Sequence, residues 1–148
     1  MNVVIMIGPS GSGKSTYIEN NLKDYFVCSA DNFFITNGEY KYDPNKIGEA
    51  HQICLKSFIE EVQKGEKNIV VDNTNTSIEQ LAPYYSIAKA YNYNVKFVKM
   101  ECTSDICVNR NQHGVNKKTI DGMFFNFSRL RLPKYWNFEL ETVKSYQE

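Results

Sequence analysis

The stretch Gly8-Pro9-Ser10-Gly11-Ser12-Gly13-Lys14-Ser15-Thr16 decides the fold of this chain. It matches the pattern G-x-x-x-x-G-K-[ST], whose backbone N–H groups cradle phosphate oxygens. An apolar run of strand length, residues 2–7, precedes it, and the sequence from Ser15 to Leu22 is typical of a helix start. A strand, a glycine-rich loop and a helix are the context that the motif requires. The sequence therefore predicts a site for a nucleoside triphosphate.

The residues of this loop have separate expected roles. The glycines allow the backbone to turn tightly and aim its N–H groups at phosphate, and the following helix adds a partial positive charge. Lys14 is expected to reach the β- and γ-phosphates, and the hydroxyl of Ser15 to sit on Mg²⁺. The predicted nucleotide-binding residues of the loop are Gly8, Ser10, Gly11, Ser12, Gly13, Lys14, Ser15 and Thr16.

Length and composition bound the class of protein. The 148 residues predict one domain, 1–148, with a core over about 1–130 and a C-terminal tail over 131–148. Lysine plus arginine and aspartate plus glutamate number 17 each, which argues against a non-specific nucleic-acid coat but leaves a local basic groove open. No run approaches the roughly 18 apolar residues of a membrane span, so no membrane partner is expected. The cysteine spacing indicates reduced thiols and a cytoplasmic location. No feature of the sequence indicates an oligomeric state.

Apolar runs alternate with helical patterns along the chain. Further strands are expected at 25–29, 68–71 and 95–100, and helices at 14–21, 45–64, 76–91, 104–111 and 117–130. The end of the tail has only weak helical character. Such alternation predicts an α/β fold, a three-layer P-loop kinase-like domain with a mainly parallel sheet of four or five strands and helices on both faces.

Two carboxylates follow strands of this predicted sheet, at the edge where ligands bind in open α/β folds. Asp72 closes a strictly apolar strand, a place where a carboxylate commonly faces Mg²⁺. Asp31 could accept the proton of an incoming hydroxyl, or it could simply cap a turn, as Asp-Asn pairs often do. Position alone does not decide between these two interpretations.

Basic and aromatic residues also allow two interpretations each. Arg110 could stabilise charge on a transferred phosphate from a mobile lid, or complement the dipole of its own helix. His51 lies on an apolar helix face, which favours a packed core histidine over a catalytic one. Packing is likewise favoured over base stacking for Phe33, Phe34, Tyr40 and Tyr42. A basic strip for a nucleic-acid backbone could comprise Lys117, Lys118, Arg129, Arg131 and Lys134.

Four segments together resemble the P-loop polynucleotide kinase family, which includes the phage kinase that phosphorylates 5′-hydroxyl ends. Their spelling is closer still to the AAA-type ATP-binding domains of a eukaryotic branch of ubiquitin-ligase-binding proteins. The resemblance extends in order over about residues 1–130. The segments are 8–16, Ser29-Ala30-Asp31-Asn32-Phe33-Phe34, Val71-Asp72-Asn73-Thr74-Asn75 and Asn109-Arg110-Asn111-Gln112-His113-Gly114-Val115.

The resemblance implies a role for each matching residue. It makes Lys14, Asp31 and Arg110 catalytic, with Asp31 as the base that activates a 5′-hydroxyl. It assigns Mg²⁺ to Ser15 and Asp72, the donor phosphates to Arg110 and His113, and the substrate side to Asp31, Phe34, Asp72, Thr74 and Asn75. Two departures stand out: Phe34 replaces an arginine that holds substrate phosphate in the phage member, and His113 replaces a second lid arginine.

The resulting expectation is an ATP- and Mg²⁺-dependent phosphotransferase that moves the γ-phosphate to a hydroxyl, most simply the 5′-OH of an RNA or DNA end. A kinase for a nucleoside, nucleotide or other metabolite is the first alternative, favoured by the neutral charge and by Phe34. A non-catalytic, ATP-dependent binding module is the second.

Overall fold

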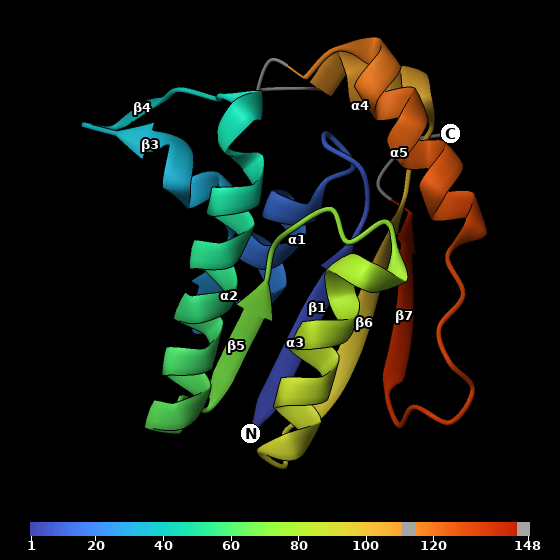
Figure 1. Ribbon diagram of the computed structural model, residues 1–148. Coiled ribbons are helices and arrows are strands. Elements are labelled where there is room, and N and C mark those ends of the chain that lie inside the picture. The colour runs from blue at the N-terminus through green and yellow to red at the C-terminus, as the bar shows by residue number, and fades with distance from the viewer. Residues whose placement is uncertain (111–114, 145–148) are drawn as a thin grey trace.

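The computed structural model describes residues 1–110 and 115–144 (Figure 1). The P-loop connects the first strand to the first helix, as the motif requires. In chain order the elements are β1 (Asn2–Ile7), α1 (Lys14–Asn21), β2 (Phe26–Cys28), the 3₁₀ helix η1 (Ala30–Phe34), β3 (Ile35–Thr36), β4 (Glu39–Tyr40), the 3₁₀ helix η2 (Pro44–Lys46), α2 (Ile47–Lys64), β5 (Asn68–Val71), α3 (Ile78–Ala90), β6 (Asn94–Glu101), α4 (Ser104–Arg110), α5 (Lys117–Arg129) and β7 (Glu139–Lys144).

Five parallel strands form the central sheet in the order β2-β5-β1-β6-β7. Helices α2 and α3 cover one face, and α1 lies on the other (Figure 1). This arrangement confirms the predicted α/β fold with a mainly parallel sheet and helices on both faces. It also brings the carboxyl ends of β1, β2 and β5 to one edge of the sheet. The P-loop follows β1 at this edge, Asp31 follows β2, and Asp72 follows β5.

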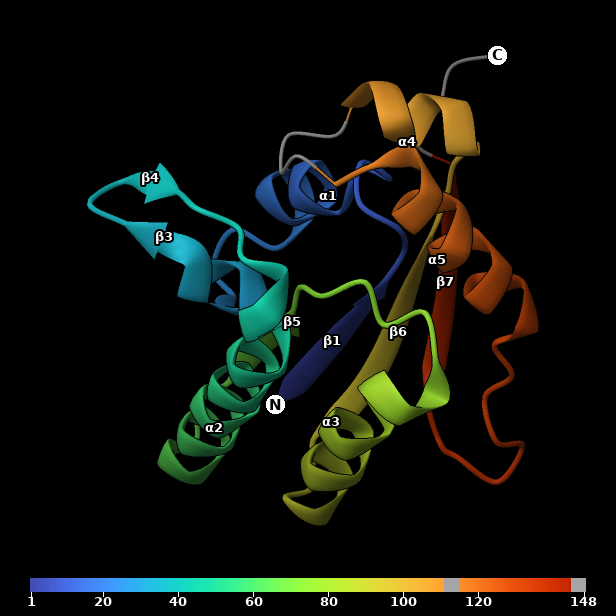
Figure 2. The ribbon, with the colours of Figure 1, turned by 45° about the horizontal axis from the view of Figure 1, so that its top comes forward.

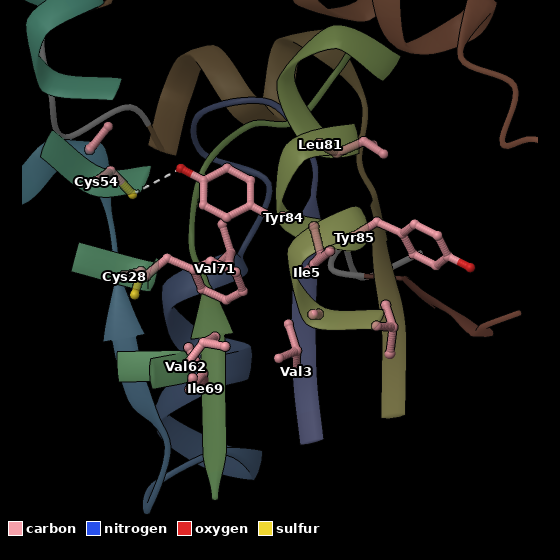
Figure 3. Close-up of a cluster of buried hydrophobic side chains, with 14 of the residues drawn as sticks. Val3, Ile5, Cys28, Cys54, Val62, Ile69, Val71, Leu81, Tyr84 and Tyr85 are labelled. Carbon is pink, nitrogen blue, oxygen red and sulfur yellow. Dashed lines mark hydrogen bonds between the residues drawn. The ribbon is translucent and has the colours of Figure 1, made fainter. Parts of the chain in front are cut away.

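The core explains why β1 is apolar at successive positions. Val3, Ile5 and Ile7 pack toward α2 and α3, in the cluster shown in part in Figure 3. Val4 and Met6 point to the opposite face and pack against α1. A strand that is buried on both faces cannot alternate polar and apolar residues. The sheet under the P-loop is therefore rigidly packed from both sides.

The predicted cap at Asp43 opens the 3₁₀ helix η2, from which α2 continues at Ile47, and α2 ends at the predicted stop, Gly65. The carboxylate of Asp43 accepts the N–H of Asn45 (3.0 Å), and Pro44 opens the turn that leads into the helix. Gly65 ends it with a φ of 78°, a left-handed conformation that glycine adopts without strain. The helix thereby holds its apolar face against β5 and η1.

The expectation of helical character at the end of the tail is wrong. Residues 139–144 form β7, a parallel edge strand paired with β6. The ring of Trp136 stacks on Tyr85 with 3.9 Å between centroids, and Phe138 meets Phe97 edge-on at 5.2 Å. These aromatic contacts bring the chain back to the sheet edge, where β6 offers unpaired backbone groups.

Helices α4 and α5 lie above the carboxyl edge of the sheet, and the short β3–β4 hairpin projects from the same end (Figure 2). The P-loop lies between these two parts. Among the residues that the structure describes, no helix has the length and apolar character needed to cross a membrane.

Candidate active site

A cavity of about 710 Å³ opens at the carboxyl edge of the sheet, over the P-loop. It brings together the three predicted catalytic residues, which come from α1, η1 and the end of α4. The predicted residues on its wall are Ser10, Gly11, Gly13, Lys14, Ser15, Thr16, Asp31, Asp72, Thr74 and Arg110. Segments distant in the sequence therefore converge on one site.

The P-loop is shaped by glycines in conformations that other residues rarely adopt. Gly11 and Gly13 have φ values of 82° and 98°. The N–H of Gly8 donates to the carbonyl of Thr74 (2.9 Å), which ties the loop to the segment after β5. Within the loop, Ser12 is fully buried. Gly8 and Ser12 are therefore not among the residues that line the cavity.

Helix α4 lies directly against the P-loop. A Cβ atom added at Gly11 would collide with the carbonyl oxygen of Cys107, in the middle of that helix. Arg110, at the end of the same helix, lines the cavity. His113 lies outside the described residues. Arg110 therefore lies beside the loop, and its role in a lid stays a prediction.

The ammonium of Lys14 is held inside the cradle. It donates hydrogen bonds to the carbonyls of Gly8 (2.8 Å) and Pro9 (2.9 Å). Burial lowers the pKa of Lys14, and the nearby Asp72 and Asp31 carboxylates oppose that shift. Left-handed glycines and a buried ammonium are the features that phosphate binding needs, so the residues present fit a nucleotide.

Asp31 is held at the start of η1. Its N–H donates to the Oγ of Ser29 (3.2 Å), and the Tyr40 hydroxyl donates to its Oδ1 (3.2 Å). Burial first, and then the Asp31 charge, raise the pKa of Tyr40, so its hydroxyl stays protonated near neutral pH. The Asp31 carboxylate therefore has an oriented donor while it lines the cavity.

The oxygens of Ser15 and Asp72 suit Mg²⁺. Both residues line the cavity, and hydroxyl, carboxylate and phosphate oxygens are the ligands that Mg²⁺ prefers. Within residues 1–110 and 115–144 there is no group of three or more His, Cys, Asp or Glu side chains able to hold a metal. A magnesium ion bound by one or two protein oxygens and the phosphates is compatible with this donor set.

Two residues expected on the substrate side are buried away from the cavity. Asn75 is 1% exposed, and its amide donates to the carbonyl of Met6 (2.8 Å), which anchors the loop after β5 to β1. Phe34 is 3% exposed, and its ring packs against those of Tyr40 and Tyr42. Neither residue is among those that line the cavity, and a role for Asn75 and Phe34 at the substrate stays a prediction of the family resemblance.

His51 is neither a fully buried core histidine nor a residue that lines the cavity. It is half-buried on α2, and burial lowers its pKa while the charge of Asp31 opposes the shift. The imidazole thus shares the electrostatic environment of Asp31 without being a core residue. Of the expected basic strip, Lys117 pairs with the exposed Asp121 (3.0 Å), as on a solvated helix face.

Several cavity residues were missed from the sequence. Asn73 stands between two predicted residues, so its position alone was a usable signal. Val143 and Lys144 belong to β7, and because the sequence did not predict that strand, it did not place them at the cavity. The other missed wall residues are Tyr17, Asn20, Asn21, Met100 and Asn109.

The fold and this cavity define a P-loop α/β domain of the kinase-like class. Residues 3–123 match the AAA domain family, and the chain belongs to that family. The chain is 31% identical over 135 residues to NEDD4-binding protein 2 of Homo sapiens, covering 86% of this chain and 8% of that protein. It is 26% identical over 136 residues to a bifunctional polynucleotide phosphatase/kinase of Schizosaccharomyces pombe, covering 88% and 30%. It thus spans less than a third of either relative.

Solved structures share the fold. A chain of the Pnkp1/Rnl/Hen1 RNA repair complex superimposes with a TM-score of 0.69 at 19% identity, covering 86% of this chain and 44% of that one. The Mycobacterium tuberculosis APS kinase CysC, solved with AMPPNP and APS, gives 0.61 at 19% identity, covering 99% and 90%. The expected likeness to P-loop polynucleotide kinases is confirmed, and kinases of small molecules have the same fold.

Proposed function

We propose that this domain transfers the γ-phosphate of ATP, with Mg²⁺, to the 5′-hydroxyl of a polynucleotide end. The observation that carries the proposal is the presence of the Asp31 carboxylate on the wall of the cavity that also holds Lys14. The charges of Asp31 and Asp72 both raise the pKa of the buried Lys14 ammonium against the effect of burial. The two carboxylates therefore lie close enough to the phosphate cradle to interact with it electrostatically. A base facing a triphosphate site is what transfer to a hydroxyl needs and what simple nucleotide binding does not.

The residues account for each part of the transfer. Asp31 takes the proton of the acceptor hydroxyl as that oxygen bonds to the γ-phosphorus. The bond from the γ-phosphorus to the β–γ bridging oxygen breaks, and ADP leaves. Lys14 and Arg110 stabilise the negative charge on the phosphate oxygens. Mg²⁺, when bound by Ser15 and Asp72, neutralises further phosphate charge.

A polynucleotide acceptor is supported by similarity to the fission yeast phosphatase/kinase and by the RNA repair complex chain. A small-molecule acceptor is the second candidate. It is favoured by the shared fold of the APS kinase and by the burial of Phe34, where the resembling family holds substrate phosphate with an arginine. A binding module without catalysis would require Asp31 to be dispensable.

A labelled γ-phosphate transfer assay tests these candidates together. Wild type, Asp31→Asn and the exposed control Asp24→Asn would be offered 5′-hydroxyl RNA, 5′-hydroxyl DNA and a panel of nucleosides and small metabolites. We expect label on an oligonucleotide end with wild type and Asp24→Asn, weakening as salt rises, and a fall to a low residual rate with Asp31→Asn. Label found only on a small molecule would show that the acceptor is a small molecule and not a polynucleotide end. Undiminished transfer by Asp31→Asn would exclude Asp31 as the base.

A further inference from the structure

Asn73, on the wall of the cavity, connects three elements. It follows Asp72 at the end of β5 and is only 7% exposed. Its Oδ1 accepts the backbone N–H of Ala30 (2.9 Å), at the start of η1. Its Nδ2 donates to the Sγ of Cys54 (3.5 Å), on α2. One side chain thereby ties the metal-side strand to the segment that carries Asp31.

The bond to Ala30 matters because η1 is short. A 3₁₀ helix of five residues has poor internal hydrogen-bond geometry, and its first N–H groups have no partner within the helix. Ala30 is buried, so an unpaired N–H there would carry an uncompensated desolvation cost. The two successive N–H groups of Ala30 and Asp31 are instead bound by the side chains of Asn73 and Ser29. The backbone on which Asp31 stands is therefore fixed from outside the helix.

The other end of the Asn73 amide is fixed as well. The Sγ of Cys54 also accepts the hydroxyl of Tyr84 (3.3 Å), a contact drawn in Figure 3. Burial raises the pKa of Cys54, so the sulfur is a neutral thiol. A sulfur acceptor on one side and a backbone donor on the other determine which way the amide of Asn73 faces. The Cys54–Tyr84 pair therefore orients the side chain that holds Ala30.

We propose that Asn73 is a positioning residue for Asp31. Its amide sets the first turn of η1 so that the carboxylate faces the cavity, and the Cys54–Tyr84 pair keeps the amide in that orientation. The role rests on the proposed function, in which Asp31 is the base. Asn73 is not a structural residue alone, because its bond is made to the residue immediately before Asp31.

The test compares Asn73→Ala with Tyr93→Phe. Tyr93→Phe also removes a side-chain hydrogen bond to a backbone group, that of the Tyr93 hydroxyl to Glu66 (2.6 Å), but at the opposite edge of the sheet. We expect Asn73→Ala to lower kcat by about 10- to 100-fold, the effect of misplacing a reacting group by about 1 Å, with KM for ATP unchanged. Tyr93→Phe should leave kcat unchanged. Tyr84→Phe, which releases only the Cys54 end, should give a smaller fall and keeps the test informative where Asn73→Ala unfolds.

Two readouts separate positioning from general damage. In an Asp31→Asn background, adding Asn73→Ala should lower kcat no further, because the group that it positions is already removed. Amide hydrogen exchange at Ala30 should become faster in Asn73→Ala. An active wild type whose kcat is insensitive to both Asn73→Ala and Tyr84→Phe, or full additivity with Asp31→Asn, would overturn this role alone. A wild type that transfers no phosphate to any acceptor would overturn the proposed function and this role together.

Discussion

The two halves of the cavity are built in different ways. The phosphate half comes from one continuous segment, residues 8–16, and its shape depends on backbone conformation at Gly11 and Gly13. The half that we assign to the acceptor is lined by Asp31 of η1 and by residues that follow β5, and side chains from the β3–β4 hairpin and α2 hold these segments in place. A continuous motif carries its own geometry, whereas an assembled site depends on the packing around it. Substitutions in the phosphate half should therefore lower transfer strongly. Substitutions around the acceptor half should lower it by smaller amounts that depend on how much packing is lost.

The largest effect is expected in the phosphate half. Lys14→Met removes the only cationic side chain within residues 8–16, and transfer should fall about 10³-fold, as for loss of a preorganised group that stabilises charge. Lys23→Met, on the exposed surface, is the matched control. Steady-state kinetics measure the transfer rate of each variant, and nucleotide titration measures its affinity for ATP. Activity within tenfold of wild type would show that the cradle works through its backbone alone.

The next effect tests whether the acceptor half depends on packing. Phe34→Ala should lower the free energy of unfolding by about 3 kcal/mol or more, because it empties a buried aromatic site beneath Tyr40. Phe125→Ala, at a ring that is 60% exposed, should change it by less than about 0.5 kcal/mol. Urea unfolding measures both. Equal stabilities, with a loss of acceptor affinity, would instead place Phe34 at the substrate.

A smaller effect is expected at Tyr40. Tyr40→Phe removes the hydroxyl that donates to the Asp31 carboxylate, so that carboxylate loses one of the groups that orient it. Its kcat should therefore fall by about 10-fold, as for the loss of a hydrogen bond to a charged group. Tyr42→Phe, whose ring also packs on Phe34, should leave kcat unchanged. Steady-state kinetics of both variants measure the difference, and an unchanged kcat in Tyr40→Phe would contradict an orienting role for this hydroxyl.

The smallest effect concerns Tyr17, which follows the phosphate-binding segment on α1. Burial, and then a hydrogen bond to Glu141 on β7, raise the pKa of Tyr17 from 10.0 to about 12. The folded state keeps this proton while the unfolded state loses it, so the contribution is complete below pH 10 and disappears as pH rises toward 12. Tyr17→Phe should cost about 1 kcal/mol or less at neutral pH and reduce the alkaline loss of stability. Unfolding curves at pH 8 and between pH 10 and 12 test this, and identical alkaline slopes would contradict it.

Features encoded locally could be predicted from the sequence. The P-loop, the cap at Asp43, the stop at Gly65 and the position of Asp72 at the end of a strand depend on neighbouring residues, and the structure contains each of them as expected. Strand β7 could not be predicted, because it follows from the stacking of Trp136 on Tyr85, 51 positions apart in the chain. The hydrogen bond of Asn73 could not be predicted either, because its partner Ala30 precedes it by 43 positions in the chain.

The contact between the P-loop and α4 has a consequence for how the two partners can vary. Residue 107 meets residue 11 through its carbonyl oxygen, an atom that every amino acid possesses. Residue 11 meets that oxygen where any side chain would begin, and its φ of 82° disfavours other residues as well. A saturation mutagenesis library selected for function should therefore retain glycine alone at position 11, while position 107 accepts many small side chains.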